Sequence, residues 1–220
     1  MTLLIFDCDG VLVDSELLAN AALAELMSAL GHPMTTGQAI ETFAGRRLSD
    51  VLARAETLLA RPIPADLGEQ AGKRMLARFR RELRAVAGVR EAIAALPFPR
   101  CVASSSTRER ITLSLEVTGL APLFGANVFS ADQVKRGKPA PDLFLAAAHA
   151  LGAAPAHCIV IEDSPLGIEA ALAAGMQAIG FAGASHATDE LAEKLARAGA
   201  AIVIRAMSDL PAAVQRLART

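Results

Sequence analysis

The sequence predicts an α/β fold: a Rossmann-like parallel sheet core with an inserted all-helical cap domain. After residue 87, short runs rich in Val and Ile alternate with helical segments, which is the pattern of a parallel sheet covered by helices on both faces. Residues 15–81 carry only helical patterns, although an apolar strand-like run precedes them at residues 3–7. Because that first strand needs the later strands as partners, we expect residues 15–81 to form the cap and residues 1–14 and 82–220 the core.

Four helices are expected in the cap. Residues 16–30 carry apolar side chains at helical spacing, and Gly31 ends this helix. The segments Thr35-x-x-Gln38 and Asp66-x-x-Glu69 are typical of capping boxes, so they predict the starts of two more helices. Residues 51–59 predict a short amphipathic helix between these two.

In the core, a strand and a helix are expected to alternate five times. The predicted pairs are residues 100–103 and 108–118, 127–129 and 141–151, 158–161 and 164–174, 176–180 and 189–198, and 201–204 and 208–217. Two helix starts carry recognisable residues. Ser106-x-x-Glu109 resembles a capping box, and Ser164 with Pro165 suits the N-cap and first helical positions.

Composition narrows the class of protein. A chain of 220 residues that is 53% hydrophobic and 20% charged is typical of a compact protein with a sizeable core. A net charge of -1 without a basic run gives no support for nucleic-acid binding. No window approaches the length of apolar sequence that crosses a membrane, and two aspartates interrupt the first apolar run too early for a signal peptide. We therefore expect a cytoplasmic protein whose partner is a small molecule.

Cysteines and histidines are expected to have no chemical role. Cys8, Cys101 and Cys158 each lie in or beside an apolar strand-like segment and lack the short spacings that hold zinc, so we expect reduced core residues. His186 follows the predicted strand at residues 176–180 and is expected to be a solvated loop residue.

Two carboxylates, one residue apart, follow the first predicted strand. Asp7 and Asp9 stand where the apolar run ends, and Gly10 permits a tight turn of the backbone. Burying an unpaired carboxylate is costly, so this position requires a cation or a proton. Open parallel sheets bind ligands at the carboxyl ends of their strands. The stretch therefore predicts a site for a hard metal ion and a phosphate.

The ends of later strands carry matching chemistry. Ser104 follows the second strand and would present its hydroxyl and the next backbone amides to a phosphate. Lys138 is fixed between a glycine and a proline, and Glu162 with Asp163 ends the fourth strand. Carboxylate oxygens beside phosphate oxygens and water suit Mg²⁺ better than a softer metal. Mg²⁺ and Lys138 together would offset the repulsion among these carboxylates.

These residues, in this order, resemble the four motifs of the haloacid dehalogenase (HAD) superfamily. The matching stretches are Asp7-x-Asp9-Gly-Val-x-x-Asp14-Ser15, Ser104 after an apolar strand, Lys138-Pro-x-Pro, and Glu162-Asp163-Ser-x-x-Gly167. The helical segment between the first two motifs is similar to the cap of the C1-capped branch, which includes β-phosphoglucomutase, phosphoglycolate phosphatase and many sugar phosphatases. The resemblance covers nearly the whole chain.

The resemblance implies a catalytic set of four residues. Asp7 would attack the phosphorus and form an aspartyl-phosphate, and Asp9 would protonate the leaving oxygen and then activate water. Ser104 and the Ser105 amide would hold phosphate oxygens, while Lys138 would neutralise the transferring group. Phosphoryl transfer requires mainly such positioning and charge stabilisation.

The resemblance also implies the ligands of the metal ion. Mg²⁺ would bind Asp7, the backbone carbonyl of Asp9, Asp163 and, directly or through water, Glu162. These ligands are oxygen atoms, which Mg²⁺ prefers.

Differences between this sequence and particular members of the superfamily narrow the choice of reaction. Dehalogenases of the superfamily lack the second aspartate of the first motif, and phosphonoacetaldehyde hydrolases have alanine there, so Asp9 favours phosphate-ester hydrolysis. The histidine and the cap arginine of β-phosphoglucomutase correspond here to Ala19 and Leu48. A phosphomutase is therefore the alternative to a phosphatase. A receiver-like regulatory domain is disfavoured because its phosphorylated aspartate lies on a later strand.

In the C1-capped branch the first cap loop comes down over the cleft, so the resemblance implies that residues 43–48 help to choose the substrate. This loop contains Arg46 and Arg47, of which only one should face the cleft because neighbouring residues at a helix start diverge. Arginine binds a carboxylate or a second phosphate with two hydrogen bonds. We therefore expect a phosphorylated sugar or sugar acid, such as phosphogluconate, with a supporting contact from Lys73.

Overall fold

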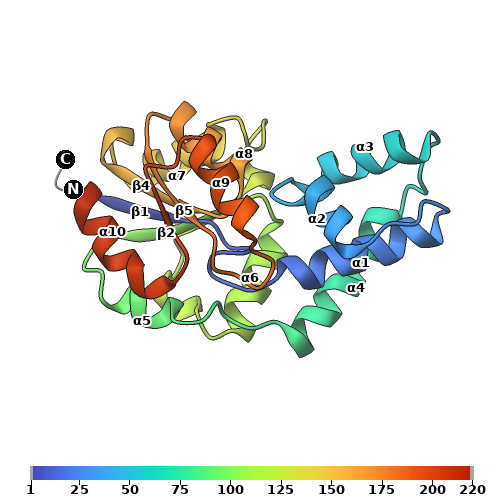
Figure 1. Cartoon of the computed structure of the whole chain (residues 1–220), viewed down its shortest axis with the longest axis horizontal. Coiled ribbons are helices and arrows are strands. Elements are labelled where there is room, and N and C mark those ends of the chain that lie inside the picture. The colour runs from blue at the N-terminus through green and yellow to red at the C-terminus, as the bar shows by residue number, and fades with distance from the viewer. Residues whose placement is uncertain (1, 219–220) are drawn as a thin grey trace.

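The core is a parallel sheet of six strands. The computed structural model describes residues 2–218, and its sheet has the order β3-β2-β1-β4-β5-β6 (Figure 1). The strands are β1 (Leu3–Phe6), β2 (Arg100–Ser104), β3 (Val128–Ser130), β4 (Cys158–Glu162), β5 (Gln177–Phe181) and β6 (Ile202–Ile204). The first strand of the chain therefore lies in the middle of the sheet, between β2 and β4. The predicted Rossmann-like α/β fold is confirmed.

Helices cover both faces of this sheet. One face carries α5 (Val89–Ala94), α6 (Arg108–Val117) and α10 (Leu210–Leu217), and the other carries α7 (Asp142–Ala150), α8 (Pro165–Ala173) and α9 (Asp189–Arg197). Successive residues of a strand point to opposite faces, so Leu4 and Phe6 pack on one side of β1 and Leu3 and Ile5 on the other. Burial on both sides explains why β1 is apolar throughout.

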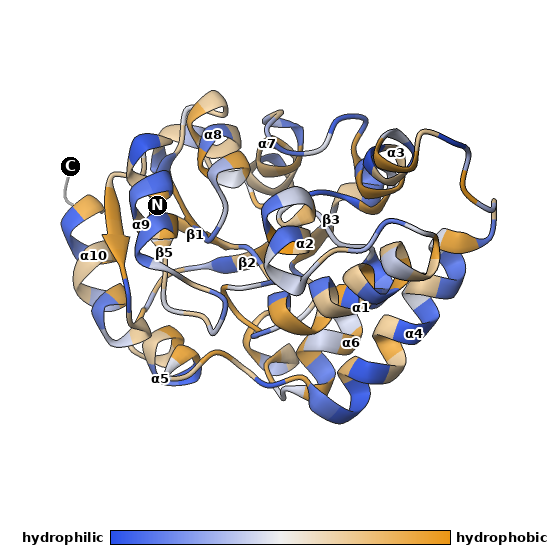
Figure 2. Ribbon diagram, turned by 45° about the vertical axis from the view of Figure 1, so that its right-hand side comes forward, coloured by the Kyte–Doolittle hydropathy of each residue, from blue (hydrophilic) through white to orange (hydrophobic). Residues whose placement is uncertain are grey.

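Four consecutive helices lie at the other end of the molecule from the sheet (Figure 1). They are α1 (Glu16–Ala29), α2 (Thr36–Phe43), α3 (Leu48–Leu59) and α4 (Leu67–Glu82). Met27, Phe43 and Val51 belong to a separate apolar cluster within this group, whereas Met75 and Phe79 of α4 join the cluster against the sheet. In Figure 2 the helices alternate blue and orange residues, as expected for helices with one buried and one exposed side. The domain limits at residues 15 and 81 remain a prediction.

Two short segments connect the four helices to the sheet, and they are bonded to each other. The Asp14 amide donates to the Arg84 carbonyl at 2.9 Å, and the Val86 amide donates to the Leu12 carbonyl at 3.0 Å. Val13 and Ala85 form an antiparallel bridge between these bonds. The chain therefore leaves the sheet and returns to it at one place.

The helix starts confirm two of the predicted caps and correct two others. Thr35 forms the predicted capping box, and Ser164 caps α8 with Pro165 at the first helical position. The capping box predicted at Asp66 is wrong, because its carboxylate accepts a bond from a side chain, Gln70, and none from the helix backbone. The box predicted at Ser106 is also wrong. Thr107 caps α6, since the Ser106 hydroxyl has another partner.

Two expectations about composition can be compared with the described residues. The three cysteines are buried and free, as predicted. Within residues 2–218, the helices lack the combination of length and apolar character that a membrane crossing needs.

The capping box at α2 gives a prediction about stability. We expect Thr35→Ala to lower the free energy of unfolding by about 1 kcal/mol, because it removes the hydroxyl that accepts from the Gln38 amide. Thr36→Ala, one residue further and without a capping bond, is the matched control. Urea denaturation of both variants measures the difference, and equal losses would contradict a capping role for Thr35.

Candidate active site

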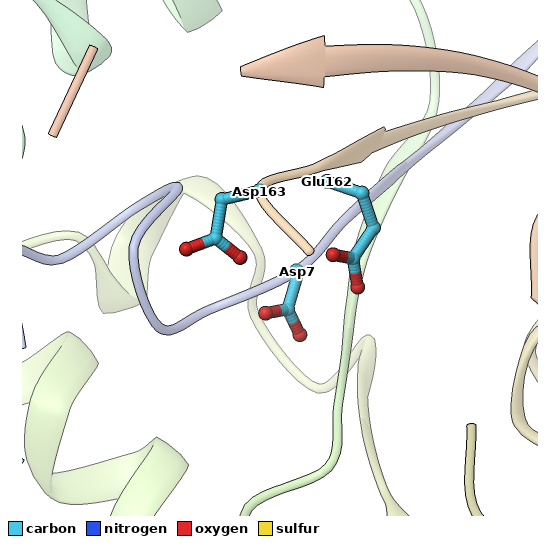
Figure 3. A group of neighbouring side chains, drawn as sticks. All are labelled: Asp7, Glu162 and Asp163. Carbon is cyan, nitrogen blue, oxygen red and sulfur yellow. The ribbon is translucent and has the colours of Figure 1, made fainter. Parts of the chain in front are cut away.

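Three carboxylates converge at the carboxyl ends of β1 and β4. Asp7 follows β1 directly, and its amide donates to the Ile161 carbonyl of β4 at 2.9 Å. This bond places Asp7 next to Glu162 and Asp163, and Figure 3 shows the three side chains gathered in one space. All three are buried, and each offers an oxygen within 4.8 Å of the others. The strand ends therefore meet as the sequence predicts.

The Lys138 ammonium lies among these carboxylates. Its Nζ is 3.0 Å from Asp7 Oδ1 and forms a second ion pair with Glu162. The Lys138 side chain is 1% exposed and lies over the Phe144 ring. Burial acts to lower the pKa of Lys138, but the charges of Asp7 and Glu162 outweigh burial and raise it. Lys138 is therefore a permanent cation inside the site.

The single positive charge of Lys138 does not balance the charges of the three carboxylates. Burial raises the pKa of Asp7 well above its usual value; Lys138 opposes this rise, and Glu162 and Asp163 add to it. Burial likewise raises the pKa of Asp163, against the hydrogen bond from His186. Both the burial of these carboxylates and their mutual repulsion disfavour the ionised forms, and a divalent cation would relieve both.

The free oxygens suit a metal ion. Glu162 already accepts three bonds, because Lys138 binds one of its oxygens and the amide and hydroxyl of Ser164 bind the other at 2.9 Å each. Asp7 and Asp163 are held through one oxygen each, by Lys138 and His186. Their second oxygens can bind a cation directly, and Glu162 is better placed to bind through water. The donor set fits Mg²⁺.

Asp9 has a different environment from Asp7. Its carboxylate accepts bonds from the hydroxyls of Ser15 at 2.5 Å and Ser106 at 2.6 Å, and from Arg110 at 2.6 Å. Burial alone would raise the pKa of Asp9, but the Arg110 charge and the two hydroxyls lower it overall. Asp9 is therefore held as a carboxylate, two residues from Asp7.

The serines after β2 connect the sheet to the first cap loop. Ser104 is 1% exposed at the end of β2, and its oxygen accepts from the Ser106 amide at 3.2 Å. The Ser105 hydroxyl donates to the Gly45 carbonyl at 3.1 Å. Gly45 has a φ of 75°, and a Cβ there would lie 2.9 Å from the Ser164 side chain. The loop can therefore approach the core closely only with glycine at this position.

The two loop arginines point in different directions. Arg46 lines the space above the carboxylates, and its Nε donates to the Thr42 carbonyl at 3.3 Å. Arg47 binds Asp50 at 3.2 Å and the Lys135 carbonyl at 3.1 Å. Arg46 lines this space and Arg47 does not, and the expectation that one of them contacts the substrate stays a prediction.

Two adjoining cavities lie between the cap helices and the core. The smaller, about 50 Å³, is lined by the catalytic candidates Asp7, Asp9 and Ser104 together with Arg46. The larger, about 420 Å³, also contains Arg46 and extends to Lys73. Lys73 is largely exposed and pairs with Glu69 at 2.5 Å. A space of this size suits a small metabolite.

Three residues of the site were missed or misplaced by sequence reasoning. Arg110 lies in the first turn of α6 and has no sequence signal that connects it to Asp9. His186 was expected in solvent, but its side chain is 5% exposed and its Nε2 lies 3.3 Å from Asp163. Gly10 makes this approach possible, because a Cβ there would lie 1.8 Å from Asp163 Oδ2.

Glu16, at the start of α1, is the third. It is buried in the wall of the smaller cavity. Burial, reinforced by the charges of Asp163 and Asp9, raises the pKa of Glu16 to about 7.

Comparison with known proteins connects this geometry to a family. A family model described as a hydrolase, haloacid dehalogenase-like hydrolase, matches residues 1–175. A 6-phosphogluconate phosphatase of Escherichia coli K12 is 28% identical over 182 residues, 82% of each chain. A phosphorylated carbohydrates phosphatase of Thermotoga maritima is 30% identical over 93% of this chain and 94% of its own. The crystal structure of a conserved haloacid dehalogenase-like protein of unknown function from Agrobacterium tumefaciens is 40% identical, with a TM-score of 0.86 over 99% of both chains.

The raised pKa of Glu16 predicts a pH-dependent effect on stability. Burial destabilises the ionised form of the Glu16 carboxylate in the folded protein. The folded state is therefore not penalised below about pH 4.5, and it loses stability as the pH rises through about 7. In metal-free protein, we expect Glu16→Gln to be more stable than the parent near pH 8 by on the order of 3 kcal/mol, with the advantage shrinking toward pH 5.

Chemical denaturation with EDTA at both pH values measures this difference. Glu41→Gln, an exposed change on α2, is the matched control and should show no such trend. A Glu16→Gln advantage that is the same at both pH values would contradict the raised pKa.

Proposed function

The chain belongs to the haloacid dehalogenase-like hydrolases, and from that premise we propose a Mg²⁺-dependent phosphatase that hydrolyses a phosphorylated sugar or sugar acid through an aspartyl-phosphate. The observation that carries the proposal is the buried contact of Lys138 with both Asp7 and Glu162 beside Asp163. A cation held among carboxylates at strand ends suits a transferring phosphoryl group, whose negative charge has to be stabilised.

Asp7 is the proposed nucleophile. One of its carboxylate oxygens attacks phosphorus, a new O–P bond forms, and the bond between phosphorus and the ester oxygen breaks. Lys138, 3.0 Å from Asp7, neutralises oxygens of the group in transfer. Ser104 and the Ser105 amide, at the end of β2, orient the remaining phosphate oxygens. Mg²⁺ on Asp7, Asp163 and, through water, Glu162 would supply further charge stabilisation when bound.

Asp9 is the proposed acid and base. It gives a proton to the departing alkoxide, then takes one from the water that attacks the phosphorus of the intermediate and releases inorganic phosphate. The bonds from Arg110, Ser15 and Ser106 favour the carboxylate, which is the form that activates water. To protonate the leaving group, Asp9 must first take up a proton from solvent, which requires that these bonds loosen.

The substrate class follows from the cavity and from the relatives. Arg46 lines both cavities beyond the phosphate position, where it can pair with a second anionic end of the substrate. Two relatives are named for 6-phosphogluconate and for phosphorylated carbohydrates. Both observations support a sugar-acid phosphate such as phosphogluconate.

Hydrolysis is proposed over transfer between two positions of one sugar. The buried residue at the position of the mutase histidine is Ala19, which lines the smaller cavity and has no group that can bind or move a proton. A phosphomutase would convert one sugar phosphate into its isomer, whereas a phosphatase releases inorganic phosphate.

The main test is phosphate release from a panel of phosphorylated carbohydrates. We expect turnover with Mg²⁺, loss of turnover with EDTA, and recovery when Mg²⁺ is restored. Asp7→Asn should reduce kcat by at least roughly 1,000-fold without unfolding the protein, because the amide retains the shape but cannot attack phosphorus. Asp142→Asn, at an exposed ion pair with Arg136, is the matched control. Isomerised product without phosphate release, or turnover by Asp7→Asn close to that of the parent, would refute the proposal.

The different directions of the loop arginines give a prediction about selectivity. We expect Arg46→Ala to lower kcat/KM for 6-phosphogluconate by roughly tenfold or more, and to change much less the value for a phosphate ester with a small neutral tail. Arg47→Ala is the control, because its side chain binds the Lys135 carbonyl. Steady-state kinetics on both substrates decide the question. If Arg46→Ala lowers kcat/KM equally for both substrates, Arg46 does not bind the anionic end of the substrate.

A further inference from the structure

The first two turns of α1 carry two buried polar side chains that the proposed phosphoryl chemistry does not use. Glu16 is 6% exposed and Asn20 is 2% exposed, and both line the cavity that contains Asp7 and Asp9. They lie one helical turn apart, so they stand on the same side of α1. A substrate whose phosphate lies beside Asp7 would place its leaving group in or next to this cavity.

The hydrogen bonds of Asn20 fix the direction of its amide. The amide lies 2.8 Å from the Glu16 carbonyl and 2.8 Å from Glu16 Oε2. A backbone carbonyl can only accept, so the atom beside it must be the Nδ2 donor. Oδ1 therefore faces away from the backbone of α1.

Asn20 Oδ1 has no hydrogen-bond partner among residues 2–218. Buried amide oxygens in folded proteins are almost always paired, so an orphaned one requires an explanation. Ala19, Leu23 and Met75 line the same cavity and have no donor to offer, and the polar residues that also line it, such as Arg46 and Ser104, make no hydrogen bond to this oxygen. A buried acceptor without a partner suits a ligand that brings its own donor.

We propose that Asn20 and Glu16 bind hydroxyl groups of the leaving alcohol, and that this pair selects polyhydroxylated phosphate esters. The inference rests on the proposed phosphatase function and extends it by assigning specificity to the first two turns of α1. A sugar or sugar acid has hydroxyls on successive carbons. One of them can donate to Asn20 Oδ1 while its neighbour exchanges a bond with the Glu16 carboxyl group.

Asn20 and Glu16 would recognise a different part of the substrate from Arg46. Arg46 recognises negative charge, whereas an amide oxygen recognises a neutral donor. A site built around a hydroxyl rejects the analogue that lacks the hydroxyl, because the buried acceptor then stays unpaired. The selectivity of Asn20 should therefore appear with neutral sugar phosphates as well as with sugar acids.

The test compares Asn20→Leu, which keeps the size and removes the polar atoms, with the parent enzyme in Mg²⁺. The substrates are 6-phosphogluconate, ribose 5-phosphate, 2-deoxyribose 5-phosphate and p-nitrophenyl phosphate, which has no sugar hydroxyl. We expect kcat/KM to fall by roughly tenfold or more on the best sugar phosphate and to change by less than about threefold on p-nitrophenyl phosphate. Asn127→Leu is the matched control, since Asn127 lies just before β3, at the opposite end of the strand from the site.

The outcomes separate the two proposals. A parent enzyme that releases phosphate from none of the carbohydrate phosphates overturns the proposed function and this inference with it. An active parent with equal losses on all substrates, or with no loss, overturns only the role of Asn20. Asn20→Ala serves as the second variant if Asn20→Leu does not melt cooperatively, and gluconate inhibition of p-nitrophenyl phosphate hydrolysis should weaken in either variant.

Discussion

The ammonium of Lys138, buried against Asp7 and Glu162, is the constraint on which the rest of the molecule depends. Buried charges are tolerable only when they are paired with good geometry, so several distant segments must meet accurately. The β1–β4 pairing brings the two carboxylates together, and glycine at 167 leaves room for Glu162, because a Cβ there would lie 2.0 Å from its carboxyl carbon. The strand order and the glycine at 167 are thus both needed to place Lys138 between Asp7 and Glu162.

The two aspartates of the first motif illustrate how environment divides chemical roles. Asp7 lies among other carboxylates and its pKa is raised, first by burial, whereas Asp9 lies among donors and its pKa is lowered. A nucleophile must be ionised, whereas burial favours the protonated form of Asp7, so its proposed role requires a bound divalent cation that favours the carboxylate. The lowered pKa of Asp9 comes from Arg110, which α6 supplies from far along the chain, together with the hydroxyls of Ser106 and Ser15.

The sequence indicated those features that depend on strand ends, and it missed those that depend on tertiary contacts. Asp7, Ser104 and Glu162 each follow an apolar run, and parallel strands must place such ends at one edge. Arg110 and His186 show no local pattern, since only the packing of α6 and of the loop after β5 brings them to Asp9 and Asp163. The capping box expected at Ser106 failed for a related reason: a distant carboxylate competes for its hydroxyl. Helix α5, with six residues, is too short to show a clear period.

The antiparallel bridge between Val13 and Ala85 has a consequence for how such a protein can change. The bridge and the bonds on either side of it fix the distance between the points where the intervening segment begins and ends. A change in the length of the loops between α1, α2 and α3 would leave this junction in place, whereas α4 is tied to the core through Met75 and Phe79. The loops between the first three helices are therefore the places where the segment can change without disturbing the strands.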